Sequence, residues 1–304
     1  MKALGRTPLG EGRYLVVVAD DFGRSASINR AVTLACDRGM VTAASIMAGG
    51  KAFDDAVHCA AGYAARLSVG LHVTLCDGYP VLAPSRIPGL VDGGGSFEGS
   101  PLRAGMTYWR SRRTLAGQIE DEVRAQFDRV ERAGIHPTHA DCHHHLHMHP
   151  VLFEIIAREA ARRGVTWIRV PREPLHLIVG LHLAHLDIKA FLLWAVFGLL
   201  ANRNLRVARK HGLRAMDNVY GLSGTGRIDE AYLLALLRYV RGGTSELYVH
   251  ADLGSASGRE EMKAVTSGRV RDRLTALGLV LTGFRGLSDR PARVVLAADQ
   301  IVRL

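Results

Sequence analysis

The chain has 304 residues, and 48% of them are hydrophobic, which is enough for a sizeable core. Its formal net charge is +10, but the basic residues are dispersed and form no dense run interleaved with aromatic residues. This pattern argues against a nucleic-acid-binding protein. The four cysteines include no C-x-x-C pair, which excludes a disulfide scaffold and predicts free thiols in a reducing compartment.

Predicted strands and helices alternate along the first half of the chain. The apolar run at 15–19 is too short for a signal peptide and is followed at once by two acids. It therefore predicts a buried strand and a cytoplasmic protein. Further strands are expected at 43–48, 68–75 and 137–142, with helices at about 27–38, 53–65 and 115–133. The Gly- and Pro-rich residues 77–105 predict a long loop, of the kind that often carries function.

The second half continues the alternation after an interruption. We expect a helix at 151–163, strands at 166–170, 214–222 and 245–251, a helix at 229–240, and a last strand from 279. Strands that alternate with helices indicate a parallel sheet. The predicted fold is a (β/α) barrel-like α/β fold, such as an irregular or incomplete TIM-type barrel. We expect one domain, 1–304, with a helical apolar insertion near 174–212.

The insertion contains a stretch, 190–201, that is apolar on every side of a helix. It is too short to span a bilayer, which needs about 20 residues. One interpretation is a buried core helix. The other is an exposed apolar hairpin that contacts a lipid or the inner face of a membrane as a peripheral anchor. Its flanking cations would then lie at the headgroups: Arg203, Arg206, Arg209 and Lys210.

Polar side chains follow four predicted strands. Asp20 and Asp21 end the first strand, and His72 with Thr74 ends the third. The segment 141–149 follows the fourth, and His250 ends a later one. Parallel α/β folds place their sites at the carboxyl ends of strands, so these groups are expected at one site.

The paired acids indicate a cation. Two adjacent carboxylates repel each other, and the pKa of one rises unless a positive charge intervenes. At a strand-to-loop turn, one acid can bind a metal while the other acts as a base. The alternative is a helix cap or an Asx-turn, which explains one aspartate but not both.

Half of the fourteen histidines fall between His136 and His149. In an extended segment, His143, His145 and His147 would share one face. Imidazole and carboxylate together admit several divalent metals. The alternative is a His-rich tract with adventitious metal affinity. His72 taken alone is more typical of a satisfied core residue than of a ligand, and His250 is a candidate acid.

Several motifs in chain order resemble those of the YdjC-like carbohydrate deacetylases. They are Val18–Gly23, Val41–Ser45, Gly70–Leu75, Pro137–His139, Asp141–Met148, Glu246–His250 and Phe284–Asp289. The Arg-rich apolar insertion resembles the HpnK-like subgroup associated with hopanoid biosynthesis. The resemblance implies a metal-dependent hydrolase that removes the acetyl group from an N-acetylated sugar, specifically an N-acetylglucosaminyl group on a hopanoid lipid.

The resemblance also implies roles for individual residues. It makes one divalent ion, Zn or Mg, the cofactor, with three ligands: Asp21, His72 and His143. Asp20 would be the general base and His250 the general acid, although Ala251 replaces the proline that usually follows this histidine. A substrate-binding or supporting position is implied for three residues: His145, His147 and Thr74.

Two other functions fit the same residues. Clustered His and Asp also build two-metal phosphoesterases, although the chain offers few carboxylates for a second metal. A non-catalytic glycolipid-binding protein at the membrane surface would use the apolar insertion without releasing acetate. The expected partner is an N-acetylated sugar or glycolipid, without nucleic acid, and a homo-oligomer is compatible with the sequence.

Overall fold

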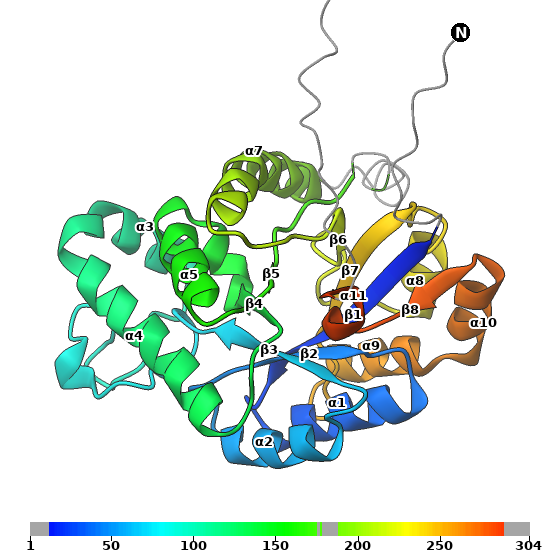
Figure 1. The fold of residues 1–304 in the computed structure, drawn as a ribbon, viewed down its shortest axis with the longest axis horizontal. Helices are drawn as coiled ribbons and strands as arrows, with labels where there is room; N and C mark the ends of the chain where they lie inside the picture. The colour runs from blue at the N-terminus through cyan, green and yellow to red at the C-terminus, as the bar shows by residue number, and fades with distance from the viewer. Residues whose placement is uncertain (1–11, 175–176, 178–187, 289–304) are drawn as a thin grey trace, which may run out of the picture.

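The strands of the computed structural model lie in one curled parallel sheet at the centre of the molecule (Figure 1). The structure describes residues 12–174, 177 and 188–288. Within them the sheet has the order β5-β4-β3-β2-β1-β7-β6, and β8 also pairs with β1. The strands are β1 (Arg13–Phe22), β2 (Ala43–Ile46), β3 (Ser68–Val73), β4 (His139–Cys142), β5 (Trp167–Ile168), β6 (Asn218–Tyr220), β7 (Gly243–Val249) and β8 (Leu279–Leu281).

The two ends of this strand order approach each other. The amide of Ile168 in β5 donates to the carbonyl of Arg214 at 2.9 Å, and the amide of Val219 in β6 donates to the carbonyl of Arg172 at 3.4 Å. The sheet therefore curls toward closure, and the predicted barrel-like α/β fold is confirmed. The prediction of a single domain over 1–304 stays a prediction.

Strand β1 is the centre of the core because it is buried on both faces. Leu15 and Val17 pack in one hydrophobic cluster, whereas Val16 and Val18 pack in another. Successive side chains of a strand point to opposite faces, so a strand covered on both sides requires the continuous apolar run seen in the sequence. This burial fixes the position of the two acids that follow.

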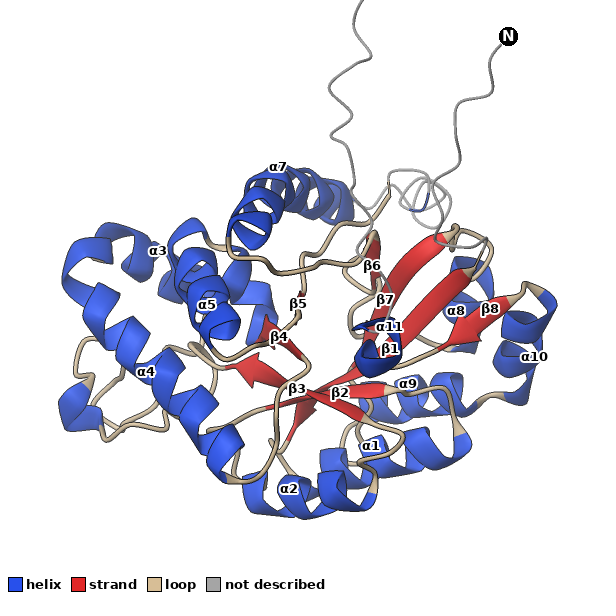
Figure 2. Ribbon diagram, in the orientation of Figure 1, coloured by secondary structure: helices blue, strands red, loops and turns tan. Residues whose placement is uncertain are grey.

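Helices cover the outside of the sheet (Figure 2). Helix α1 (Ala26–Arg38) begins where the Ser25 hydroxyl accepts a hydrogen bond from the amide of Ile28, as an N-cap does. The other helices that follow strands or pack beside them are α2 (Phe53–Gly62), α4 (Arg112–Arg132), α5 (Pro150–Arg162), α8 (Glu230–Leu236), α9 (Ala256–Thr266), α10 (Gly268–Ala276) and α11 (Phe284–Ser288).

The predicted loop at 77–105 is wrong at its end. A short 3-10 helix, η1, occupies Pro84–Arg86, and helix α3 occupies Pro101–Arg110. Ser100 caps α3, and Pro101 stands at its first turn, where the missing N–H costs nothing. Both signals were present in the sequence but lie inside a stretch dominated by glycine.

The apolar stretch 190–201 lies in helix α7 (Ile188–Lys210). One side of α7 packs inward: Ala201 and Asn204 are fully buried, and the Asn204 amide donates to the carbonyl of Met148 at 3.0 Å. Leu192 and Leu199 on the opposite side are 65% and 78% exposed. The interpretation of this stretch as a wholly buried core helix is therefore wrong. Residues 175–176 and 178–187 of the insertion lie outside the described residues.

A search of the described residues finds no helix with both the length and the apolar character needed to cross a membrane.

Candidate metal centre and active site

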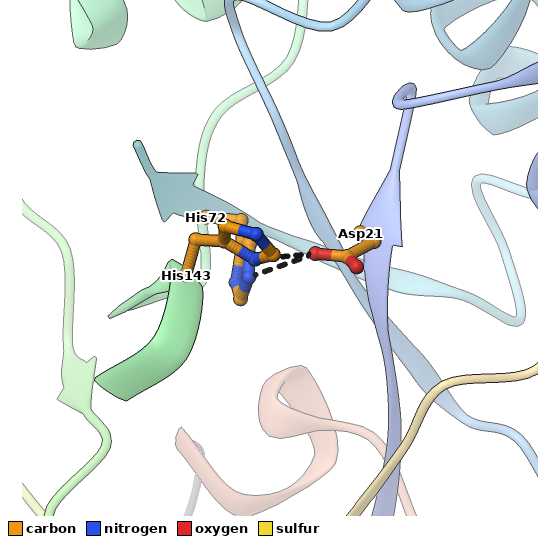
Figure 3. A group of neighbouring side chains, drawn as sticks. All are labelled: Asp21, His72 and His143. Carbon is orange, nitrogen blue, oxygen red and sulfur yellow. Dashed lines mark ion pairs between the residues drawn. The ribbon is translucent and has the colours of Figure 1, made fainter. Parts of the chain in front are cut away.

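Asp21, His72 and His143 meet at the carboxyl end of the sheet (Figure 3). Asp21 comes from β1 and His72 from β3, and His143 opens the short helix η2 (His143–Met148) after β4. Oδ1 of Asp21 lies 2.9 Å from Nδ1 of His143 and 3.3 Å from Nε2 of His72. One donor atom from each residue lies within 4.8 Å of the others, which is compatible with three ligands of one ion.

The second nitrogen of His72 is fixed by a carboxylate. Nδ1 of His72 donates to Oδ1 of Asp141 at 2.7 Å, so the tautomer leaves the Nε2 lone pair facing Asp21. Metal-binding histidines are commonly held in this way. Nε2 of His72 and Oδ1 of Asp21 are buried without a hydrogen-bond partner. Two buried atoms that carry lone pairs, face each other and lack a hydrogen bond are suited to bind a metal ion between them.

The electrostatics of the pocket favour a cation. Burial opposes the charged form of His72, but Asp141 and its neighbouring carboxylates outweigh it and raise the pKa of His72 to about 10. Burial also opposes ionisation of Asp21, but the neighbouring imidazoles of His143 and His72 hold its pKa well below the usual range. A pocket that stabilises protons on imidazole this strongly also stabilises a metal cation that takes the same lone pairs.

His143 has two further neighbours that the sequence did not indicate. Its Nε2 lies 3.3 Å from Oδ2 of Asp77 and 3.0 Å from Nη1 of Arg24. When Nε2 donates to Asp77, the lone pair of Nδ1 faces Asp21. Asp77 sits in the residues predicted as a loop, and no pattern there distinguished it from a surface acid.

A second set of potential ligands shares one member with the first. Asp77, His143 and His144 also bring one donor atom each within 4.8 Å of the others. However, Nη2 of Arg24 lies 3.0 Å from Oδ2 of Asp77. A guanidinium at this position opposes a cation at this second set of ligands.

Backbone strain concentrates at this site. Among the described residues, positive φ angles outside glycine occur at Asp21, Asp77, His144 and His145. Each such conformation costs on the order of 1–3 kcal/mol and typically marks a functional position. The φ angles of 55° at His144 and 52° at His145 interrupt the helical conformation inside η2 and produce a kink. The prediction of an extended segment with three histidines on one face is therefore wrong.

Asp20 is held by a residue that the sequence analysis missed. Arg169 follows β5 and is fully buried, and its Nη1 and Nη2 lie 2.7 and 2.8 Å from the two oxygens of Asp20. Arg169 also pairs with Asp141 at 2.8 Å and with Glu246. An arginine just after a short apolar strand was the available signal, since buried arginine requires acidic partners.

Arg169 does not neutralise all of the acids around it. Its own pKa is held well above the usual range, because Asp141, Asp20 and Glu246 outweigh the effect of burial. Burial raises the pKa of Glu246 to about 7 in spite of the ion pair with Arg169. The pocket therefore keeps excess negative charge beside the potential metal ligands.

His250 lies beside Asp20 because β1 and β7 are paired. Ala19 is the register partner of Val249, so Asp20 and His250 are the next residues on neighbouring strands. The His250 amide donates to Glu261 at 2.6 Å, and its Nδ1 is buried without a hydrogen-bond partner. A ring nitrogen without a protein partner at the strand end is available for proton transfer.

The other predicted histidines pack around this centre. The His145 ring lies 4.6 Å from the Tyr248 ring, and burial together with Arg169 holds the His145 pKa well below the usual range. Nε2 of His147 donates to the Arg169 carbonyl at 2.9 Å. These contacts place both histidines around the residues that hold Asp20, and their roles stay predictions.

Thr74 anchors the end of β3. Its amide and carbonyl pair with the Gln126 side chain at 2.9 and 2.7 Å, and its hydroxyl donates to the His72 carbonyl at 3.3 Å. Thr74 is fully buried in this arrangement. Its position supports the backbone of His72, and a contact with substrate stays a prediction.

A cleft of about 510 Å³ opens beside the centre. Its lining includes Arg24 and Asp77, which contact His143, together with Lys51, Tyr79 and Phe97. The Tyr79 ring is 44% exposed, and Nζ of Lys51 lies 5.0 Å from its centroid. An exposed aromatic ring with polar neighbours is the kind of surface that binds sugar rings.

Two proteins named as deacetylases are similar to this chain in sequence. The chain is 29% identical over 284 residues to a carbohydrate deacetylase of Geobacillus stearothermophilus, covering 90% of this chain and 97% of that protein. It is 36% identical over 165 residues to a chitooligosaccharide deacetylase of Escherichia fergusonii, covering 53% of this chain and 60% of that protein.

One solved structure shares the fold. An Enterococcus faecalis protein, provisionally named for cellobiose-phosphate cleavage, superposes with a TM-score of 0.71 at 21% identity over 91% of this chain and 99% of that one. The family model described as YdjC-like protein matches residues 14–276. That span contains β1 from its second residue, all of β2 to β7, and every residue of the centre described above. The chain therefore belongs to the YdjC-like protein family.

Proposed function

We propose that this protein is a metal-dependent carbohydrate N-deacetylase. The observation that carries the proposal is the placement of Asp20, fixed by Arg169, beside the donor set of Asp21, His72 and His143. This arrangement puts a carboxylate base next to a position for a divalent ion. The names of the two deacetylase relatives support an N-acetylated sugar as the substrate.

The reaction is hydrolysis of the acetamide C–N bond. Asp21, His72 and His143 would hold a divalent ion, which would supply Lewis acidity toward the attacking water and the acetyl carbonyl. Asp20 accepts the proton of the attacking water as the oxygen–carbon bond forms. His250 donates a proton to the sugar nitrogen as the C–N bond breaks, so that acetate and a free amine leave.

The orientation of these groups comes from the chain itself. Arg169 holds both oxygens of Asp20 in one plane, and Asp141 holds the His72 ring. Such fixed groups reduce the reorganisation that the reaction requires. The register of β1 with β7 pairs Ala19 with Val249, which supports paired roles for the next residues, Asp20 and His250.

For the natural substrate, we propose an N-acetylglucosaminyl group on a hopanoid lipid. The cleft lined by Tyr79 and Lys51 is large enough for a sugar unit. The apolar outer side of α7 gives a polycyclic lipid a surface that a free oligosaccharide does not need. Zn or Mg would serve as the ion, since carboxylate and imidazole ligands are compatible with both.

Acetate release tests the activity directly. Purified protein should release acetate from N-acetylglucosamine oligosaccharides, lose this activity after chelation, and regain it with one divalent metal. Elemental analysis should find about one equivalent of metal, whereas about two would favour a phosphoesterase. Protein that carries metal but releases no acetate from any N-acetylated sugar would contradict the proposal. Mass spectrometry of bacterial lipid extracts should then show which glycolipid loses one acetyl group.

A further inference from the structure

Helix α3 exposes an apolar stripe. Leu102, Met106 and Trp109 are 72%, 45% and 51% exposed. They are spaced at i, i+4 and i+7, which places them on one face of the helix. The opposite face is anchored in the protein by Ala104 and Tyr108, both of which are buried. The exposed stripe is therefore presented by a helix with a fixed orientation.

Helix α7 exposes a second stripe with the same spacing. Leu192, Val196 and Leu199 are 65%, 45% and 78% exposed. The inward side of α7 packs on the active-site segment, where the Phe197 ring lies 6.2 Å from the His145 ring. The apolar residues of the outer side are thus not needed for packing within the described residues.

The α3 stripe contacts His149, and Arg203 of α7 lies close enough to affect the same residue. The His149 ring lies 5.8 Å from the Trp109 ring of α3. Burial lowers the pKa of His149, and the nearby charge of Arg203 in α7 lowers it further. Arg203 follows Leu199 by one helical turn. Figure 1 shows α5, which begins after His149, between α3 and α7.

An apolar groove of about 430 Å³ lies along α3 and the start of α5. Leu102, Met106 and Trp109 line it on the α3 side, and His149 and Pro150 line it on the α5 side. We call the exposed residues of the two helices, with this groove, the α3–α7 surface.

The charged residues in the two helices of the α3–α7 surface are basic only, and two of these pair with neighbouring acids, Arg103 with Glu98 and Lys210 with Glu154. Neither α3 nor α7 contains an aspartate or glutamate. Exposed cations lie at Arg103, Arg110, Arg206, Arg209 and Lys210. Each basic residue near an anionic bilayer contributes about 1 kcal/mol of attraction. A protein partner would also require matching acids, whereas a lipid surface supplies negative headgroups beside apolar chains.

We propose that the α3–α7 surface binds an anionic lipid bilayer. Leu102, Met106, Leu192 and Leu199 enter the headgroup–acyl boundary, and Trp109 lies at the level of the headgroups, where tryptophan is favoured. The arginines reach the lipid phosphates. The proposal extends the expected contact at 190–201 to a second helix, and it does not require the deacetylase activity.

Vesicle flotation tests this binding. The full-length protein should float with vesicles of phosphatidylcholine and phosphatidylglycerol, less at high salt, and poorly with phosphatidylcholine alone. Leu199→Ser and Trp109→Ser should each weaken binding by about tenfold, because each removes one buried apolar side chain from the bilayer. Val280→Ser is the matched control, because Val280 is also an exposed apolar residue, at 48%, but lies away from the α3–α7 surface. It is in β8, which pairs with the beginning of β1.

Two further measurements separate the outcomes. Trp109→Ser should keep wild-type acetate release from a soluble N-acetylglucosamine oligosaccharide, which distinguishes lost docking from a lost active site. Unchanged flotation of both variants, or equal binding to neutral vesicles, would overturn the proposal. A dimer in light scattering that Leu199→Ser dissociates would overturn it as well, because the surface would then bind a second copy.

Discussion

The side chains of Asp20 and Arg169 form a bidentate ion pair, with distances of 2.7 and 2.8 Å between the two guanidinium nitrogens and the two carboxylate oxygens. Both groups are buried, at 1% and 2% exposure. The pair holds a carboxylate in one orientation at the edge of the metal donor set. The two adjacent aspartates therefore have different partners: Asp20 contacts the arginine, whereas Asp21 contacts the histidines.

Asp20→Asn should keep the metal and lose most of the turnover. The amide preserves the shape of the carboxylate but cannot accept a proton, and a positioned proton acceptor contributes about 10²–10⁴-fold. Acetate release and metal content should be measured on the same preparation. His143→Ala is the matched change at a ligand and should lose the metal instead. A fully active Asp20→Asn protein would show that another group is the base.

Asp141→Asn should weaken metal binding by about 10–100-fold, because a carboxylate that accepts from the other ring nitrogen makes the imidazole a better ligand. Competition with a chromogenic chelator measures the affinity. Ser45→Ala is a milder control, because it removes one neutral hydroxyl that donates to Asp141 at 2.7 Å and leaves the carboxylate in place. Wild-type affinity in Asp141→Asn would mean that orientation of His72 does not depend on this charge.

Arg169→Met should destabilise the fold by about 3–5 kcal/mol, because Asp20, Asp141 and Glu246 would be left buried without their shared cation. Urea unfolding of the metal-free protein measures the loss. Arg66→Met is the control: Arg66 pairs with Asp37 at the surface with 58% of its side chain exposed. Solvent screens that exposed pair, so its loss should change the free energy of unfolding far less. Similar losses in the two variants would argue against an essential buried network.

His250→Gln should reduce turnover on an N-acetylated sugar by about 10²–10⁴-fold without changing the metal content. The reason is the loss of the group that protonates the leaving amine. A substrate with a weakly basic leaving amine should be affected much less, since it needs less protonation. An equal loss on both substrates would point to a role in binding rather than acid catalysis.

Stability should fall as the pH drops below about 6.5. Burial lowers the pKa of His139 to about 3 and that of His147 to about 4, whereas both take the ordinary value of 6.5 when unfolded. Between these limits the unfolded chain binds more protons, so stability present above pH 6.5 is lost as the pH falls toward the folded values. Each such histidine contributes a slope of about 1.4 kcal/mol per pH unit.

Urea unfolding at pH 4.5 to 7.5, with chelator present, measures this slope. His139→Gln should reduce it, and His58→Gln, which removes an exposed imidazole, serves as the control. A slope unchanged by His139→Gln would show that His139 takes up its proton in the folded protein as well.

The sequence by itself determined the order of the parallel β/α elements and the strand ends that carry the site. The apolar run 15–19 and the polar residues directly after it are local patterns, and parallel strands bring their carboxyl ends to one edge. For this reason the strand ends that carry Asp20 and Asp21, His72 and the segment 141–149 could be grouped before any contact was known. The choice of Asp21, His72 and His143 as the ligands came from the resemblance to the family. The roles assigned to Asp20 and His250 stay predictions, although pairing of β1 with β7 places them side by side.

Only the tertiary structure decided which other residues complete the site and which helix faces remain exposed. Arg169, Glu246 and Asp77 reach the centre from separate parts of the chain, and their meeting depends on how far the sheet curls. The helical path of η2 depends on local strain that the surrounding packing holds in place, which no repeat of histidines reveals. Likewise, the stretch in α7 is apolar on all sides, so periodicity could not distinguish its packed face from the exposed one, and only the position of α5 and η2 beneath it does.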